Sequence, residues 1–276
     1  MSPLILALSA SLTWGVADFV GPLRARTLGT LPVLLWAQVG GLLAIAIAVA
    51  VRGSGPHGWA VAYASIASIS GTLGIYAYYR GIAIGAMSVV VPIAGAGAAI
   101  PVAVGLLSGD RPSQLQITGV ICAVGGVVLA SHERRDGSLR IAAGVGLALL
   151  AAVGFGGYFL PMHAAGKVDF WWSTLVFRTT TLLLIGSAAA VSRPALRMGP
   201  RNLFICMLVG IGDTLGNMFF AASSRSGLVS LTAVLASLFP MVTIALAAIF
   251  LRERIASTQR VGVMLTLAGV VLISAG

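Results

Sequence analysis

Two charged side chains lie where charge is costly, in the middle of long apolar runs. Asp213 lies within GIGDTLGNMFF (210–220), and Arg178 lies within FRTTT (177–181). Ionisable groups inside a bilayer are rare and mark a solute pathway, a proton relay or a structural pair. A carboxylate at Asp213 could exchange a proton as a solute passes, or it could pair with Arg178 and fix the packing. The sequence leaves both roles open, and the two are compatible.

Depth along the helices favours contact between Arg178 and Asp213. At a rise of about 1.5 Å per residue, Arg178 is expected about 10 Å and Asp213 about 13 Å from the same membrane face. Asp18 and Arg80 form a second candidate pair near the C-terminal ends of two parallel helices. We expect a structural or gate-lining salt bridge there, although Arg80 could instead extend to the interface.

The elements that must position these groups are membrane-spanning helices. Of 276 residues, 58% are apolar and 9% are charged, and the mean hydropathy is +1.02. Soluble domains carry roughly a quarter charged residues, so a soluble enzyme is excluded. A spanning helix needs about 20 apolar residues, which predicts an all-α integral membrane protein with ten transmembrane helices. They are expected at 3–21, 31–51, 59–80, 87–107, 115–131, 141–160, 171–191, 202–222, 228–251 and 259–275.

The net charge of +10 is attributed to membrane topology, not to nucleic acid. Basic residues stand singly or in short clusters between apolar runs, with no aromatic-interleaved basic face that could follow phosphates. One set of loops carries twelve arginines and the other set carries four basic residues. The positive-inside rule then predicts that both termini lie outside the cell.

The chain divides into two similar halves, residues 1–131 and 141–276, joined by the polar linker 132–140. Thr72-Leu73-Gly74 recurs 142 positions later as Thr214-Leu215-Gly216, and GVVLAS (126–131) resembles GVVLIS (269–274). Five helices per half is an odd number, so the second half enters the membrane from the opposite face. The sequence therefore predicts two inverted five-helix repeats, a common construction of secondary transporters.

Prolines interrupt the predicted fourth and ninth helices. Pro92 and Pro101 lie in the fourth helix and Pro240 lies in the ninth. Proline removes a backbone hydrogen bond and kinks a helix, so each is a hinge candidate, with irregular packing as the alternative. Pro240 aligns with Ala98 rather than with a proline, so the interruptions are not symmetric.

The sequence resembles the EamA family of the drug/metabolite transporter superfamily along its whole length. The shared marks are Trp14-Gly15, the proline-bearing fourth helix, and the acidic–Arg turns Asp110-Arg111 and Glu253-Arg254. The resemblance implies an exporter or facilitator of small organic solutes, amino acids among them. It also implies a cavity between the halves, formed mainly by the first, third and fourth helices and their repeat partners. Relatives generally have both termini in the cytoplasm, against the charge count, so the orientation stays open.

Several side chains on these helices are candidates for lining such a cavity. Aromatic side chains could bury apolar solute surface, and Tyr and Trp could also form hydrogen bonds. The amide of Asn217, one turn beyond Asp213, could bind a polar group of the solute or link two helices. The alternative for the aromatic residues is packing. The candidates are Trp14, Tyr76, Tyr79, Phe155, Tyr158, Asn217 and Phe220.

The sequence favours a secondary transporter that works by alternating access, most readily as an exporter in the plasma or inner membrane. No metal-ligand cluster or close catalytic carboxylate pair is found in the sequence, so we expect neither an enzyme nor a metal or cofactor. The expected partners are a small-molecule substrate, the lipid bilayer and protons as a coupling candidate, with the protein a monomer or weak homodimer. The alternatives are a lipid-linked solute flippase and a membrane binding or scaffold protein without transport.

Overall fold

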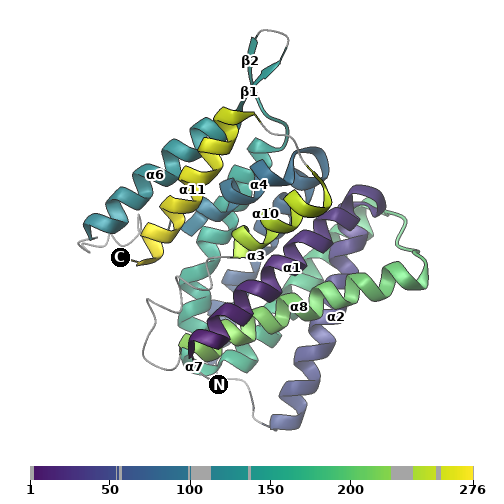
Figure 1. Ribbon diagram of the computed structural model, residues 1–276. Helices are drawn as coiled ribbons and strands as arrows, with labels where there is room; N and C mark the ends of the chain where they lie inside the picture. Colours follow the sequence, from purple (N-terminus) through teal and green to yellow (C-terminus); the bar gives the residue numbers. More distant parts are fainter. Residues whose placement is uncertain are drawn as a thin grey trace.

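The computed structural model describes residues 3–53, 55, 58–98, 100, 113–135, 138–224, 239–252 and 256–275. These residues are almost entirely helical (Figure 1). The helices are α1 (Pro3–Leu28), α2 (Thr30–Arg52), α3 (Gly58–Ile84), α4 (Met87–Gly95) followed by the 3-10 turn η1 (Ala96–Ala98), α6 (Gln114–Ser131), α7 (Val145–Ser192), α8 (Pro200–Ser224), α10 (Phe239–Phe250) and α11 (Ser257–Ala275).

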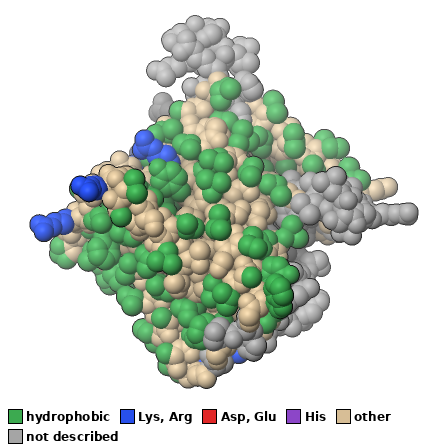
Figure 2. Space-filling model, turned by 180° about the vertical axis from the view of Figure 1, so that it is seen from behind, with side chains coloured by type: hydrophobic (Ala, Val, Ile, Leu, Met, Phe, Trp, Pro, Cys, Tyr) green, Lys and Arg blue, Asp and Glu red, His purple; other side chains and the backbone are tan. Residues whose placement is uncertain are grey.

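The helices are long and apolar, as the composition requires. Five described segments are long and apolar enough to cross a membrane: Thr30–Arg52, Gly58–Ile84, Val145–Gly166, Val168–Ser192 and Pro200–Phe219. Large aliphatic side chains remain exposed along them, for example Leu43, Ile47 and Leu183. Figure 2 shows apolar side chains spread over one whole face, with basic side chains gathered toward its margin. Such a surface suits a hydrocarbon environment.

Several helix boundaries differ from the sequence prediction: α3 ends at Ile84 and not at 80, α4 ends at Gly95 and not at 107, and α7 begins at Val145 and not at 141, which lies in a strand. Two further differences arise because prolines do not end the helices. α1 continues past Pro22 to Leu28, where Arg26 donates hydrogen bonds to the carbonyl oxygens of Ile82 and Gly85 at the end of α3, at 3.0 Å each. α7 continues through Pro161 and breaks only at Asp169, whose φ of −157° and ψ of 107° are extended. The predicted loop after residue 160 is therefore mostly helix.

The predicted linker is a short antiparallel hairpin. Strands β1 (His132–Arg135) and β2 (Ser138–Ile141) pair from His132 opposite Ile141 to Arg135 opposite Ser138. The hairpin projects from the helices; the N-terminus lies toward the opposite end of the molecule, and the C-terminus lies at the end of α11 that is away from the hairpin (Figure 1). The Asp-Gly dipeptide at 136–137 of the sequence is a signal for such a hairpin.

The central helices form two bundles, each of which contains helices from both halves of the chain. In the first bundle, α8 packs along α1 and α2, and α10 packs on α1; in the second bundle, α3 packs along both segments of α7, and α4 packs on α7. α6 and α11 pair with each other at one edge (Figure 1). The two bundles meet most extensively where α2 lies against α7.

Glycines allow the helix backbones within each bundle to approach closely. A Cβ atom at Gly210 of α8 would overlap the carbonyl oxygen of Ala37 in α2, and one at Gly97 would overlap that of Ala152 in α7. Small residues at a helix interface permit this contact. At two glycines between the bundles, a side chain makes the contact: the hydroxyl of Tyr79 lies on Gly21, and the ring of Pro240 lies on Gly95.

Candidate functional site

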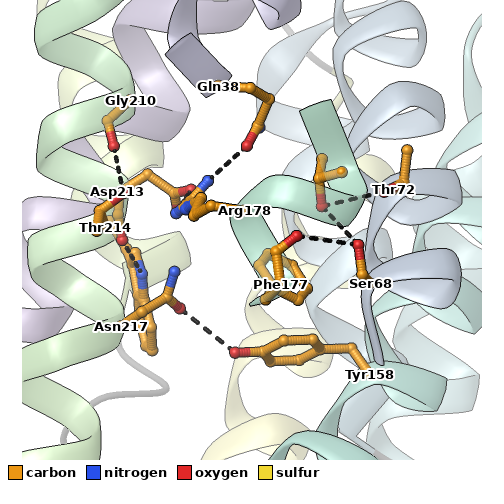
Figure 3. Close-up of polar contacts among 12 residues, drawn as sticks. Gln38, Ser68, Thr72, Tyr158, Phe177, Arg178, Gly210, Asp213, Thr214 and Asn217 are labelled. Carbon is orange, nitrogen blue, oxygen red and sulfur yellow. Dashed lines mark hydrogen bonds and ion pairs between the residues drawn. The ribbon is translucent and has the colours of Figure 1, made fainter. Parts of the chain in front are cut away.

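Arg178 and Asp213 form an ion pair between the two bundles. Arg178 projects from the second segment of α7, and its Nη2 atom contacts the Oδ2 atom of Asp213 on α8. Its Nη1 atom donates to the Oε1 atom of Gln38 on α2 at 3.0 Å. Figure 3 shows Arg178 between these two partners. The arginine of the second bundle thus binds two helices of the first, and the two residues have the proximity that their sequence depths predict.

The two members of this ion pair differ in accessibility. The Arg178 side chain is 1% exposed, whereas that of Asp213 is 32% exposed. The outward stripe of α8 contains Phe204, Leu208 and Leu215, all exposed. Because a helix turns about 100° per residue, Asp213 lies about 180° from Phe204, on the inward side of α8. The accessible carboxylate surface therefore faces the interior of the protein and not the lipid.

Asn217, Tyr158 and Trp14 surround Asp213 with polar and aromatic groups. Asn217 lies one turn from Asp213, and its Oδ1 atom accepts a 3.4 Å hydrogen bond from the hydroxyl of Tyr158 on α7 (Figure 3). The ring of Tyr158 packs edge-on against Phe177, with centroids 5.3 Å apart. The indole Nε1 atom of Trp14 donates to the Asp213 carbonyl oxygen at 3.3 Å. Three sequence candidates therefore meet at one place, around Asp213.

Two of the other aromatic candidates, Tyr76 and Phe155, lie apart from this cluster. Tyr76 is exposed in line with Ile69 and Leu73 on the outer stripe of α3, and Phe155 packs against Tyr78 and Gly74 within the second bundle. Tyr79 is buried against Gly21 of α1. Phe220 lies in α8, but its side chain is outside the described residues.

Asp18 and Arg80 do not form the expected salt bridge in the part of the chain that the structure describes. Arg80 is exposed, on the outer stripe of α3 with Leu73 and Tyr76, so it points away from the bundle interior. Asp18 is partly buried on α1, one turn after Trp14. The α1–α8 packing, with Ala17 near Gly212 and Trp14 against Gly216, places Asp18 near the level of Asp213.

The hinge candidates are only partly described. Pro92 is buried within α4, and the helix tightens to the 3-10 turn η1 four residues later. Pro240 lies at the start of α10 and contacts Gly95. Pro101 and the turn Asp110-Arg111 lie outside the described residues, as does Glu253. The arrangement brings the two described prolines toward the same α4–α10 contact.

A second ion pair between the bundles was not anticipated from the sequence. Arg52, at the end of α2, binds Asp169 at the break in α7, with 2.9 Å between Nη1 and Oδ1. The same Oδ1 atom accepts hydrogen bonds from the backbone N–H groups of Trp171 and Trp172 at 2.9 and 3.3 Å. Asp169 therefore caps the second segment of α7. The sequence signal for this cap is an Asp two residues before Trp171.

Hydroxyl groups make a separate network within the second bundle. Thr181 of α7 is hydrogen bonded to Ser68 at 2.8 Å and to Thr72 at 3.2 Å, both on α3 (Figure 3). Ser68 also donates to the carbonyl oxygen of Phe177 at 3.1 Å. These bonds join α3 to α7, so they stabilise one bundle and do not cross to the other.

Metal binding has no visible basis in the described ranges, where no group of three or more His, Cys, Asp or Glu side chains could hold an ion. The arrangement around Asp213 suits reversible binding of a solute or proton, because one carboxylate is accessible from within and its counter-ion is buried.

Comparisons with known proteins agree with this architecture. Residues 1–132 and 142–275 each match the family model described as the EamA-like transporter family. A solved crystal structure that is 17% identical shares the fold, with a TM-score of 0.66; the match covers 98% of this chain and 95% of the other. No curated protein matches the chain.

Proposed function

The chain belongs to the EamA-like transporter family, and on this premise we propose that it is a carrier of small organic solutes that works by alternating access. Members of this family are integral membrane transporters and not enzymes. The finer assignments are the inverted repeat, the moving parts, the role of Asp213 and the direction of transport.

Reciprocal glycine contacts support two inverted five-helix repeats, residues 1–131 and 141–276. Gly15 of α1 lies on Val242 of α10, and Gly156 of α7 lies on Ile100, the residue 142 positions before Val242. In the same way, Gly216 lies on Trp14 and Gly74 lies on Phe155. A two-fold relation between the halves produces this exchange of partners. With an odd number of spans per half, it makes the repeats antiparallel across the membrane.

The observation that carries the function is the contrast between contacts within and between the bundles. Within each bundle, glycines bring helix backbones together; the contacts between the bundles include the packing of α2 on α7, the hydrogen bonds from Arg26 to α3, and both ion pairs of the described residues, Arg178–Asp213 and Arg52–Asp169. Close backbone packing resists sliding, whereas ion pairs and side-chain contacts can separate and re-form. We assign the two bundles as the units that rock about the Asp213 region.

Asp213 is the group that we assign to solute gating or proton coupling. Its carboxylate faces inward and its partner Arg178 belongs to the other bundle, so binding a solute or a proton there changes the bond that joins the bundles. A solute or proton can shift the balance between two conformations of a carrier only if it binds one conformation more tightly than the other. We propose outward transport across the plasma or inner membrane, by a monomer or weak homodimer, with amino acids and related metabolites as the first solutes to test.

The experiment is a solute panel followed by counterflow. The purified chain is screened by thermal shift in detergent, since a ligand that binds the folded state raises its unfolding temperature. Each stabilising solute is then tested for counterflow of its labelled form in liposomes. Exchange is expected for at least one solute, and Asp213→Asn should slow it or abolish its pH dependence.

The outcomes separate the rival functions. A scaffold protein gives no counterflow with any solute, which would overturn the carrier proposal. Transfer of only a lipid-linked solute between leaflets would indicate a flippase. Unchanged counterflow and pH dependence in Asp213→Asn would remove the coupling role while leaving transport standing.

A further inference from the structure

The accessible part of the central ion pair carries negative charge. Arg178 is buried, and its two Nη atoms bind Asp213 and Gln38. Asp213 is 32% exposed, and only its Oδ2 atom is used by Arg178. A solute that reaches this place from the interior therefore meets a carboxylate and not a guanidinium. Carboxylate oxygens accept hydrogen bonds and do not donate them.

A second acidic side chain, Asp18, lies beside the central ion pair, and no ion pair is found for it among the described residues. α1 and α8 pack with Ala17 near Gly212 and Trp14 against Gly216, which places Asp18 near the level of Asp213. Arg178 is the guanidinium that pairs with Asp213. Buried charge is costly unless it is paired, so the two carboxyl groups favour a positively charged solute group beside them.

Aromatic rings stand beside the carboxylate. Trp14 donates to the backbone of Asp213, and Tyr158 binds Asn217 one turn away. Trp14 also packs edge-on against Phe239, with centroids 6.1 Å apart. Aromatic faces attract ammonium groups and bury the apolar part of a ligand. Both properties suit a solute with a cationic head and an apolar body.

We propose that the solute site at Asp213 selects solutes bearing a positively charged amine over neutral and anionic analogues. This inference rests on the proposed carrier function and adds the substrate class to it. Asp213 binds the ammonium group, Asp18 places a second carboxyl group beside it, and Asn217 and Tyr158 contact the remainder. Arg178 positions Asp213 and does not itself contact the solute.

The test is isothermal titration of the purified full chain with four matched compounds at neutral pH. They are 2-phenylethylammonium, its N-trimethyl form, 2-phenylethanol and 3-phenylpropionate. The ammonium compound should bind about tenfold more tightly than the alcohol, because a hydrogen bond to a charged group outweighs a neutral one. The trimethyl form should lie between them, since it keeps the charge and loses the donors. The propionate should bind most weakly.

Three variants identify the group responsible. Asp213→Asn should reduce ammonium binding to the level of the alcohol, and Asp213→Glu should retain most of it. Glu133→Gln, which removes the same charge from strand β1 of the hairpin, should leave all four affinities unchanged. Equal binding of the alcohol and the ammonium compound, tighter binding of the propionate, or unchanged ammonium binding in Asp213→Asn would each overturn the proposal. So would a folded protein that binds none of the four.

Failure here is distinguishable from failure of the carrier function. Counterflow of a neutral or anionic solute, without selective amine binding, leaves the carrier standing and removes the cation selectivity. Selective amine binding without counterflow of any solute would support the cation selectivity and remove the carrier function.

Discussion

Removing either member of the Arg178–Asp213 ion pair should destabilise the protein unequally, because the two side chains differ in burial. Asp213→Leu leaves the guanidinium of Arg178, which is 1% exposed, with Gln38 as its remaining side-chain partner. Arginine cannot release its proton in proteins, so the charge stays buried. Loss of one partner from a buried pair costs about 3–5 kcal/mol.

Arg178→Met should cost less, although it removes the larger side chain. The carboxylate that it leaves behind is 32% exposed and can be hydrated or protonated. The main cost arises because the buried oxygen of Gln38 loses its hydrogen-bond donor, which lowers the free energy of unfolding by about 1–3 kcal/mol. The double variant, Arg178→Met with Asp213→Leu, should be more stable than Asp213→Leu alone, because no buried charge remains.

The assay is the apparent unfolding temperature of the four proteins in one detergent. For a chain of this size 1 kcal/mol corresponds to roughly 2–4 °C, so Asp213→Leu should unfold about 6–20 °C below the wild type. The unfolding temperature of Arg178→Met should lie between those of the wild type and of Asp213→Leu. If the loss in the double variant equals the sum of the single losses, the ion pair is not coupled and the argument from burial is refuted.

Two further predictions concern packing and capping. Gly210→Ala places a methyl group against the carbonyl oxygen of Ala37 and should lower the free energy of unfolding by about 1–3 kcal/mol. Gly186→Ala is the control, because its Cβ would have only Leu35 Cδ1 near it, at 4.0 Å, and it should be nearly neutral in the same unfolding assay. Equal losses in the two variants would contradict the close packing. Asp169→Ala removes a helix cap worth about 1 kcal/mol as well as an ion pair. Arg52→Ala removes the ion pair but leaves the cap, and the Arg52 side chain is 40% exposed, so Asp169→Ala should lower the unfolding temperature more. The reverse order would show that the cap contributes little.

Much of the helical framework follows from the sequence because apolar runs must be helical in a membrane. The runs at 31–51 and 259–275 agree with α2 and α11 to within about two residues. The chain ran past the predicted end of α1 because a proline near a helix end can be accommodated by neighbouring groups. The break in α7 was placed too broadly, because a single capping Asp is enough to start a new segment.

The sequence predicts the site residues whose type is rare in apolar helices, and it does not predict those whose type is common there. Arg178 and Asp213 stood out as charges in apolar runs, and their equal depth indicated contact. Tyr76 is a candidate by residue type alone, but whether it faces outward depends on which neighbours pack against α3. The grouping of helices from both halves into each bundle was also beyond reach, since it depends on contacts between distant segments.

The central claim, that two bundles rock against each other to carry solute, is tested most directly by joining them. Cysteines replace Arg52 and Asp169 in a chain with Cys122 and Cys206 changed to alanine, and a short bis-maleimide with a cleavable disulfide spans the two positions. Counterflow of the solute chosen by the binding panel is then measured in liposomes before and after cleavage by a reducing agent. The account predicts that exchange stops in the joined protein and returns after cleavage. Undiminished exchange by fully joined protein would contradict it.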